Sequence, residues 1–395
     1  MRCERIDATE AKLLWEKAPL WLLARLATEA KVRKSGDKVF YNKNFHLEPT
    51  NICLFECRFC SYRRRKGEAG AWDYSMEEVL AQVASRKASG ATEIHIVGGV
   101  HPERDLYYYA EMIRGVKRIM PEVCVKAFTA VELHYMIRKA GLSIEDGLQL
   151  LKEAGMESIP GGGAEIFDEK IRAEICPGKC SSAEWLEMHE KAHKLGFDSN
   201  ATMLYGHIEK IDHRIDHLMR LRDLQDKTGG FNAFIPLKFR SANNGLELLG
   251  ETSVVDDLRT LAMSRLILDN VPHIKAYWVM YGKATAEMAL SFGADDIDGT
   301  IEDSTKIYSM AGASDERPRL TIAEIEKMCA SAGYRAVERD THYNEINGKR
   351  KTENYEKFLV LVEETYNSIQ YRSYCVGVFG FGDCGIYRNG SRYTP

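Results

Sequence analysis

The feature that most constrains this chain is a run of three cysteines between Asn51 and Tyr62, in which Cys53, Cys57 and Cys60 have a C-x3-C-x2-C spacing. Three thiolates this close in sequence can surround one iron–sulfur cluster. A [4Fe–4S] cube normally takes four cysteines, and no fourth cysteine lies nearby. One iron would then lack a protein ligand, and a small molecule could bind it, as at the open position of a catalytic metal site.

A disulfide or a structural zinc site is the alternative interpretation of these cysteines. Zinc takes four protein ligands, usually from two paired runs. A cytosolic chain also keeps its thiols reduced. The spacing therefore favours a cluster.

The cysteine spacing resembles the signature of the radical S-adenosylmethionine (SAM) enzymes. In that superfamily SAM binds the open iron, and an electron from the cluster releases methionine and a 5′-deoxyadenosyl radical. The superfamily places an aromatic residue before the third cysteine, beside the adenine, and Phe59 has this position. The resemblance implies a [4Fe–4S] cluster, SAM as a consumed co-substrate, and an electron donor such as flavodoxin or ferredoxin.

Composition excludes several other classes of protein. The chain has 395 residues, a hydrophobic content of 45% and a formal net charge of −4, so it can bury a large core and gives no reason to expect nucleic acid. No apolar run reaches membrane-spanning length, and the first residues lack the apolar region of a signal peptide. Ten cysteines are too few for a disulfide scaffold. We expect a cytoplasmic protein.

A strand-then-helix unit recurs from residue 45 onward, which predicts a parallel sheet. The predicted strands are Phe45–Cys53, Glu93–Val100, Val123–Ala130, Ser158–Ile166, Asp198–Gly206, Phe231–Phe239, His273–Gly282 and Ala294–Gly299. The predicted helices are Ser75–Gly90, Tyr107–Met120, Ser143–Gly155, Ser181–Gly196, Lys210–Gly229, Ser253–Val271 and Ala284–Gly293. Eight strands over about 250 residues match a TIM barrel, and an open doubly wound sheet is the alternative. We predict an α/β fold with a TIM-type (β/α)8 radical SAM barrel.

Further segments flank the predicted barrel. Two helices separated by Pro19 are expected near the N-terminus, and a helix and a strand (Arg335–Asp340) near the end of the fold. The predicted parts are an N-terminal helical cap (1–44), the barrel (45–300), a C-terminal α/β closing segment (301–346) and a peripheral tail (347–395).

A wider resemblance extends from about Asn42 to Tyr343. This part of the chain resembles the group that contains the aminofutalosine synthases, the futalosine cyclases and the deazaflavin-forming synthases. The segments most similar to the aminofutalosine synthases are Thr228–Phe239, His273–Met280, Phe292–Thr300 and Val337–Tyr343. The resemblance implies addition of the 5′-deoxyadenosyl radical to 3-[(1-carboxyvinyl)oxy]benzoate, followed by rearrangement and decarboxylation, in menaquinone biosynthesis. The sister enzymes of the group are the alternative.

Candidate site residues follow from this resemblance and from the strand ends, where barrel active sites lie. For SAM we expect contacts from Phe59 and Tyr62 (adenine), Gly98 and Gly99 (methionine amino group), Glu132 and Glu165 (ribose), and Arg172 (methionine carboxylate). The substrate has two carboxylates, which require cationic and amide donors. Its candidate ligands are His101, Asn200, His207, Lys238, Arg240 and Tyr277.

Two motifs point to zinc if they are considered alone. His189, Glu190 and His193 form an H-E-x-x-H sequence, which is typical of zinc hydrolases. On the predicted helix both histidines lie at the edge of the apolar stripe, so packing is the favoured interpretation and a zinc hydrolase a remote alternative. Cys176 and Cys180 could complete a site with them, but the gap is shorter than usual zinc spacings.

Two further motifs remain. The basic run Arg63–Lys66 could bind an acidic electron donor, or it could simply be a solvated loop. Gly380–Gly385 has a G-x-G-x-x-G spacing. Too few residues follow it to form a dinucleotide site, so we expect no such site there.

Overall fold

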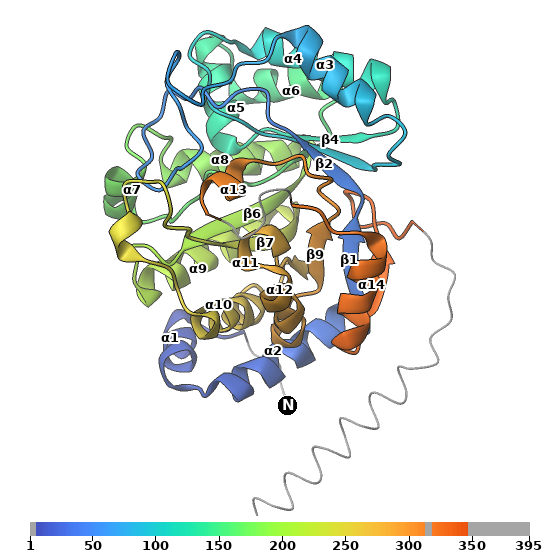
Figure 1. Cartoon of the computed structure of the whole chain (residues 1–395). Helices are drawn as coiled ribbons and strands as arrows, with labels where there is room; N and C mark the ends of the chain where they lie inside the picture. Colours follow the sequence, from blue (N-terminus) through green and yellow to red (C-terminus); the bar gives the residue numbers. More distant parts are fainter. Residues whose placement is uncertain (1–4, 313–317, 347–395) are drawn as a thin grey trace, which may run out of the picture. The chain divides into compact units, whose positions relative to one another are not determined.

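The computed structural model describes residues 5–312 and 318–346. Seven parallel strands form one sheet in the order β2-β3-β4-β5-β6-β7-β8, with helices on its outer side (Figure 1). The strands are β2 (Asn44–Leu47), β3 (Glu93–Ile96), β4 (Cys124–Ala127), β5 (Ser158–Ile159), β6 (Asp198–Tyr205), β7 (Phe231–Lys238) and β8 (His273–Ile274). Strand order follows chain order, as in a barrel of repeated strand–helix units.

The ring is closed by a second group of strands. β1 (Lys38–Asn42) pairs in parallel with both β9 (Asp296–Gly299) and β10 (Arg335–Glu338). An isolated parallel bridge between Lys275 and Asp296 joins the end of β8 to β9, and β1 leads directly into β2. The predicted TIM-type α/β barrel is confirmed, and the predicted strand near 335–340 is present as β10.

The outer helices begin where the sequence provides capping side chains. Complete capping boxes open α3 (Met76–Ser85), α5 (Ala130–Lys139), α8 (Ser182–Lys194) and α14 (Ile322–Ser331). Gly155 and Gly229 adopt left-handed conformations that end α6 (Ile144–Ala154) and α9 (Ile211–Thr228). Both devices satisfy backbone groups that a helix end leaves unpaired.

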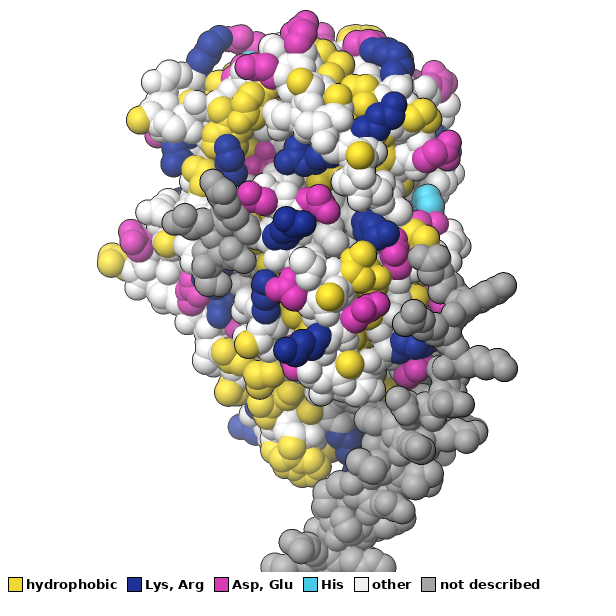
Figure 2. Space-filling model, turned by 45° about the vertical axis from the view of Figure 1, so that its right-hand side comes forward, with side chains coloured by type: hydrophobic (Ala, Val, Ile, Leu, Met, Phe, Trp, Pro, Cys, Tyr) yellow, Lys and Arg dark blue, Asp and Glu magenta, His cyan; other side chains and the backbone are white. Residues whose placement is uncertain are grey.

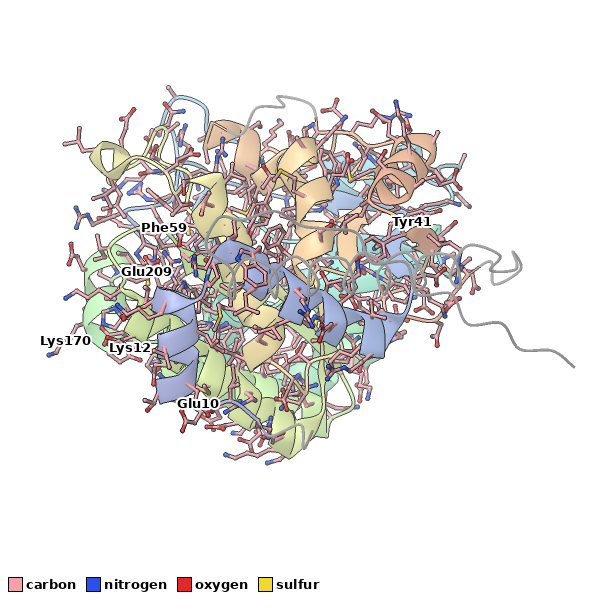
Figure 3. All side chains as sticks on the ribbon, turned by 90° about the horizontal axis from the view of Figure 1, so that it is seen from below. Glu10, Lys12, Tyr41, Phe59, Lys170 and Glu209 are labelled. Carbon is pink, nitrogen blue, oxygen red and sulfur yellow. The ribbon has the colours of Figure 1, made fainter. Side chains whose placement is uncertain are left out.

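The remaining helices complete the outer layer or connect the strands. They are α4 (Leu106–Ile119), α7 (Glu169–Ile175), α10 (Val254–Ile267), α11 (Trp278–Tyr281), α12 (Lys283–Ala289) and α13 (Ile307–Met310), with short 3-10 turns η1 (Glu247–Leu249) and η2 (Leu290–Phe292). The predicted N-terminal helices are present as α1 (Ala8–Lys17) and α2 (Leu20–Ser35). α1 contacts α9 and α10, and α2 contacts α10 and η2. Figure 3 views these helices from below, with Glu10 and Lys12 on α1.

The sequence predictions differ from the structure in several places, and α5 and α7 are helices that were not predicted. The segment predicted as strand from 273 to 282 is a two-residue strand followed by α11, since Tyr277–Gly282 turns into a helical segment. The segment predicted as strand from 158 to 166 is extended only at Ser158–Ile159, and it continues as a loop. β1, inside the segment predicted as helical cap, was not predicted.

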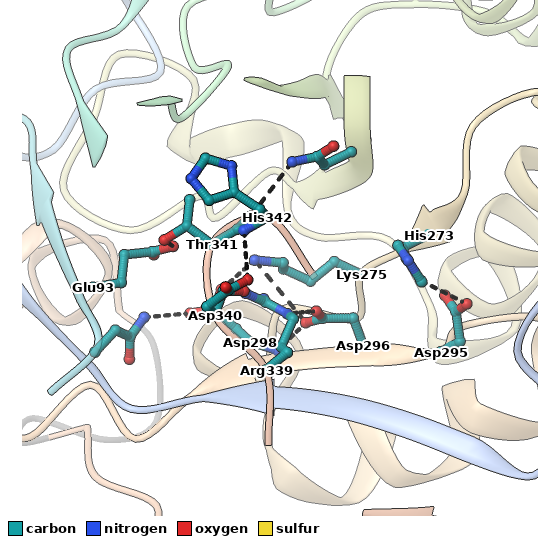
Figure 4. Close-up of polar contacts among 12 residues, drawn as sticks. Glu93, His273, Lys275, Asp295, Asp296, Asp298, Arg339, Asp340, Thr341 and His342 are labelled. Atoms are coloured by element: carbon teal, nitrogen blue, oxygen red, sulfur yellow. Dashed lines mark hydrogen bonds and ion pairs between the residues drawn. The ribbon is translucent and has the colours of Figure 1, made fainter. Parts of the chain in front are cut away.

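A network of buried charges fills one end of the barrel interior (Figure 4). Lys126 pairs with Glu93 at 2.6 Å, and Arg339 pairs with Asp296 at 2.7 Å. Lys275 pairs with Asp298 at 2.5 Å. Although burial raises the pKa of Glu93, the charges of Lys126, Arg339 and Lys275 together lower it to about 2. These residues come from β3 and β4, from β9, and from the ends of β8 and β10. The network therefore links strands of the seven-stranded sheet to the strands that close the ring.

The surface carries both signs of charge. Lys and Arg side chains are interspersed with Asp and Glu on the face shown in Figure 2. Within the described ranges, no helix has the length and apolar character needed to cross a membrane. The predicted tail (347–395) and the glycine motif at 380–385 lie outside the described residues.

Candidate active site

The three cysteines of the signature lie on the loop that follows β2. Cys53, Cys57 and Cys60 are free thiols and are partly exposed. The backbone N–H of Val100, in the loop after β3, donates to Cys53 Sγ at 3.4 Å. Burial raises the pKa of the Cys53 thiol and raises that of Cys57 to about 12, whereas metal coordination favours the thiolate form. The loop thus has the chemistry of a metal-binding loop.

Two glycines allow this loop to pack directly on the end of β3. A Cβ at Gly99 would lie 2.3 Å from the carbonyl oxygen of Ile52, and one at Gly98 would lie 2.8 Å from that of Thr50. Gly99 N–H also donates to the Thr50 carbonyl at 2.8 Å. In the structure these glycines permit close approach of the cysteine loop; their approach to the methionine of SAM stays a prediction.

The two aromatic residues predicted for adenine differ in what they contact. Tyr62 is buried, packs edge-to-face on Trp72, and donates its hydroxyl to the Thr50 carbonyl at 3.2 Å. Phe59 is partly buried, and the ammonium of Lys179 lies 5.2 Å from its ring centroid. Tyr62 therefore supports the loop, whereas Phe59 borders a charged group. Figure 3 marks Phe59.

Lys179 is a site residue that the sequence did not reveal. Its ammonium pairs with Glu165 at 2.7 Å. Burial lowers the pKa of Lys179, but the charges of Cys57 and Glu165 raise it well above the ordinary value. Glu165 also has a left-handed backbone, with φ 50°. Lys179 follows the cysteine loop by more than a hundred residues, and no spacing rule connects the two segments. The only available signal was its place in the Cys176–Cys180 segment.

Lys179 and Phe55 also line a cavity of about 440 Å³ beside the cysteine loop. The other walls come from α5 and from the segment around Cys180 and Glu184. The cavity therefore gives the outer side of the loop a recess lined by both charged and aromatic groups.

Glu132 and Arg172 hold backbone in place. Glu132 accepts from the Gly98 N–H at 3.1 Å and from Thr129, whose hydroxyl caps α5. Burial raises the pKa of Glu132 to about 7. Arg172 donates to the carbonyl oxygens of Ala164 and Ile166 and of Cys180. Glu132 thus fixes the glycine segment, and Arg172 fixes the loop after β5. Their contacts with SAM stay predictions.

The basic residues predicted for the substrate already have acidic partners. Lys238, on β7, pairs with Asp257 at 2.9 Å, and Arg240 pairs with Glu251 at 3.2 Å. His207 follows β6, and its Nδ1 accepts from the Ile208 N–H at 2.8 Å. All three lie at or after the carboxyl ends of neighbouring strands, as predicted. A substrate carboxylate would meet two ion pairs there rather than two unpaired cations.

The other three substrate candidates are buried. His101 Nδ1 accepts from the N–H groups of Glu103 and Arg104, and its Nε2 lies 3.2 Å from Asp73. Tyr277 packs edge-to-face on Tyr308, 5.0 Å between centroids. Asn200 lies on β6. Their contacts with a substrate stay predictions.

The H-E-x-x-H motif lies on α8, outside the barrel, and its histidines make hydrogen bonds within the protein. His189 Nδ1 lies 3.0 Å from Ser199 Oγ, and His193 contacts both Ser199 and Thr228. Glu190 pairs with Lys194. Across residues 5–312 and 318–346, no three His, Cys, Asp or Glu side chains converge on a single ion. The motif therefore serves packing, as the sequence favoured.

The basic run after the cysteine loop pairs with nearby acids and carbonyl groups. Arg63 and Arg65 both pair with Glu56, and Lys66 pairs with Glu103 at 2.9 Å. These partners neutralise part of the charge that a reductant would meet. Binding of a reductant at this run stays a prediction.

Two family models match consecutive parts of the chain. Residues 47–221 match the radical SAM superfamily, and residues 228–352 match the CofH/MqnC C-terminal region. The first match includes the cysteine loop and β3 to β6. That superfamily uses a [4Fe–4S] cluster and SAM. The three free thiols on one glycine-supported loop fit such a cluster, since a four-iron cube is larger than one ion and its ligands need not converge on a point.

Curated relatives extend over most of the chain. An aminodeoxyfutalosine synthase of Thermus thermophilus is 44% identical over 350 residues, which cover 88% of this chain and 94% of the relative. An aminodeoxyfutalosine synthase of Streptomyces coelicolor is 41% identical, covering 86% and 90%. A 5-amino-6-(D-ribitylamino)uracil–L-tyrosine 4-hydroxyphenyl transferase of Methanosarcina barkeri is 36% identical, covering 87% and 89%.

Solved structures support the barrel. The crystal structure of a methylornithine synthase has a TM-score of 0.68 and 17% identity, covering 85% of this chain and 95% of that one. At this identity the likeness concerns the fold. Together with the full-length relatives and the cysteine loop, it shows that the chain belongs to the radical SAM superfamily and, within it, to the family that contains the aminodeoxyfutalosine synthases.

Proposed function

We propose that this protein is an aminodeoxyfutalosine synthase that joins the 5′-deoxyadenosyl group of SAM to 3-[(1-carboxyvinyl)oxy]benzoate. The observation that carries the proposal is the 44% and 41% identity to two synthases of that name over nearly their whole length. The radical adds to the enol-ether double bond. Rearrangement onto the ring and loss of the carboxyl group as carbon dioxide or bicarbonate then give the product.

When bound, the [4Fe–4S] cluster supplies the electron that cleaves SAM into methionine and the 5′-deoxyadenosyl radical. The chain's own residues would hold the parts around it. Cys53, Cys57 and Cys60 would ligate three irons. Thr50, supported by Gly99 and Tyr62, would keep the loop rigid, and Phe59 would flank the adenine.

The barrel interior suits a radical reaction. A reactive carbon must meet its acceptor at short distance and away from water, and the parallel strands surround such an interior. Lys238 and Arg240 with their acidic partners would bind the polar end of the substrate at the mouth, where an incoming carboxylate can compete for the cations.

The identity of the adenosyl product tests the proposal. Anaerobically reconstituted protein, reduced in the presence of SAM and 3-[(1-carboxyvinyl)oxy]benzoate, is expected to give a product that contains the adenosyl carbon skeleton, detected by mass spectrometry. Free 5′-deoxyadenosine as the stoichiometric product would instead indicate a sister enzyme that abstracts hydrogen. The 36% identity to the hydroxyphenyl transferase makes tyrosine with 5-amino-6-(D-ribitylamino)uracil the second substrate set to assay. Turnover of that set alone would reject the synthase assignment.

A further inference from the structure

Two histidines inside the barrel have ring nitrogens without partners. His46 on β2 and His95 on β3 are paired in strand register, and their ring centroids lie 4.5 Å apart. Nδ1 and Nε2 of His46 and Nε2 of His95 are buried without a hydrogen bond within the described part of the chain. Buried polar groups in native proteins nearly always have partners. The pair therefore has hydrogen-bonding capacity that the protein itself does not use.

The groups around the pair place it in the lumen. Asp298 of β9 and Glu93 of β3 face His46, as do Lys275 and Lys126, from the end of β8 and from β4. Side chains from both sides of the ring can meet only in its interior. His95 keeps part of its surface accessible, which for an inward side chain indicates open space.

The surrounding charges are already matched with each other. Lys126 pairs with Glu93 and Lys275 with Asp298. Neither ion pair includes a histidine nitrogen. No three metal-ligating side chains converge anywhere in residues 5–312 and 318–346, so the pair is not part of a metal site. An ordered water, or a molecule that enters the lumen and displaces it, is the remaining partner.

The position of His46 and His95 along the strands fits contact with the end of the substrate that lies away from the cysteine loop. His95 precedes Gly98 by three residues, or about 10 Å along a strand. Gly98 packs against the segment that leads into the cysteine loop, where the radical would form. Glu93 precedes His95 by two residues on the same strand, and Lys126 is level with His95 in the strand register, so the ion pair of Glu93 and Lys126 closes the lumen on the side away from the loop. The acceptor double bond must lie near the cysteine loop. The aromatic end of the substrate then points towards the histidines.

We propose that His46 and His95 form the deep end of the substrate pocket and donate ring N–H groups to the carboxylate on the aromatic ring of the substrate. The assignment rests on the proposed function. A neutral imidazole has one N–H donor, and two such donors match the two oxygens of a carboxylate. Burial lowers the pKa of His46 to about 4 and that of His95 well below its ordinary value. Both rings are then neutral at pH 7, as two single donors require.

Binding to the cluster-loaded, unreduced enzyme with SAM present tests the assignment, because no turnover occurs without a reductant. The two ligands are 3-[(1-carboxyvinyl)oxy]benzoate and the analogue that lacks the ring carboxylate. Wild-type protein should bind the first more tightly. His46→Leu and His95→Leu should weaken its binding about 10- to 100-fold, the range for hydrogen bonds to a charged group, and should leave binding of the analogue unchanged. His95→Asn, which keeps an N–H donor, should retain part of the preference.

His189→Gln is the matched control. His189 is fully buried, but it lies on α8 outside the barrel, and its variant should keep the preference for the ring carboxylate. Equal weakening for both ligands in the leucine variants, or no weakening, would overturn the assignment. Iron content and thermal unfolding show whether each variant is folded.

A second measurement needs no variant. In wild-type protein with ¹⁵N-labelled histidine, the substrate should shift the ring ¹⁵N signals of two histidines, and the analogue should not. Equal shifts with both ligands would also overturn the assignment. These experiments distinguish a failure of the histidine assignment from a failure of the proposed function. Wild-type protein that makes no adenosyl adduct refutes the function, whereas an active enzyme whose histidine variants keep the carboxylate preference refutes only the role of the pair.

Discussion

At the scale of single residues, the contact between Gly99 and the cysteine loop is a tight constraint on the predicted cluster-binding segment. The Ile52 carbonyl lies where a side chain at position 99 would begin. Backbone cannot yield as a flexible side chain does, so any Cβ there displaces the loop. Cys53, a predicted iron ligand, is the residue after Ile52, and Cys57 follows four residues later.

We therefore expect Gly99→Ala to fold but to lose most of its bound iron after anaerobic reconstitution, measured by iron analysis and by absorbance. Gly115→Ala is the control, since the atoms nearest to a Cβ at Gly115 belong to the side chain of Leu80, the closest of them a methyl carbon at 2.6 Å. Its helix position also favours alanine. Full iron content in Gly99→Ala would contradict the expectation.

The residues that carry chemistry could be predicted only where spacing or resemblance marks them. The cysteines, Phe59 and the two glycines were predicted in this way, and the structure packs Gly99 against the cysteine loop. Their contacts with a cluster and with SAM stay predictions. Lys179 was missed because its contact with Glu165 and Phe59 arises from the packing of two distant loops. His46 and His95 were missed because alternation along a strand does not show that a buried ring nitrogen lacks a partner.

At the scale of secondary-structure elements, α5 links helix capping to the candidate SAM site. Thr129 Oγ accepts from the backbone N–H of Glu132 at 3.2 Å. The side-chain carboxylate of Glu132 accepts from the backbone N–H of Gly98. The helix start and the glycine segment are thus fixed by one side chain.

Thr129→Ala should destabilise the protein by about 1 kcal/mol, the usual cost of losing an N-cap. It should also weaken SAM binding to the cluster-loaded enzyme roughly 3- to 10-fold, because Glu132 is released. Ser143→Ala removes the cap of α6 in the same way but should leave SAM binding unchanged. Chemical unfolding and SAM titration measure the two effects. Equal SAM affinity in both variants would show that the cap has no influence on the site.

Elements were predictable where periodicity and caps agree. The two N-terminal helices and the helices that open on Ser75, Ser143, Ser181 and Ser253 were found. The strand predicted from 273 to 282 was wrong because an apolar aromatic run fits a buried strand and a buried short helix equally well. The end of β5 was overestimated because glycines 161–163 follow it without a polar break.

At the scale of the whole molecule, the buried ion pairs of the barrel interior make stability depend on acid. The unfolded chain protonates Glu93 near the ordinary pKa of 4.5, whereas the folded protein does so at about 2. The stabilisation is therefore complete above about pH 4.5 and is lost as the pH falls towards 2. The shift corresponds to about 3 kcal/mol.

Glu93→Gln should flatten the pH dependence of the free energy of unfolding between pH 4.5 and 2. It should also cost about 3–5 kcal/mol near neutral pH, because Lys126 becomes an unpaired buried charge. Glu111→Gln removes an exposed carboxylate paired with Arg118 and should change the curve little. Urea unfolding at a series of pH values gives both quantities. A wild-type slope in Glu93→Gln would assign the acid sensitivity to other groups.

The barrel class was predictable from the recurrence of strands and helices, but its closure was not. β1 is short and lies in a segment whose start is helical. Its partners β9 and β10 lie about 255 and 300 residues further along the chain. No local pattern in the sequence reports such pairing.

Since β1 lies between β9 and β10, synthesis on the ribosome imposes an order on maturation. β1, the strand made first, has no lateral partner along its whole length until residues 296–338 have emerged. The cysteine loop, which follows β2 by a few residues, is therefore translated long before the wall behind it is complete. A cluster that is loaded into the closed barrel must therefore be loaded after translation. Until then the thiols of the cysteine loop depend on chaperones or on a reducing environment for protection from aggregation and oxidation.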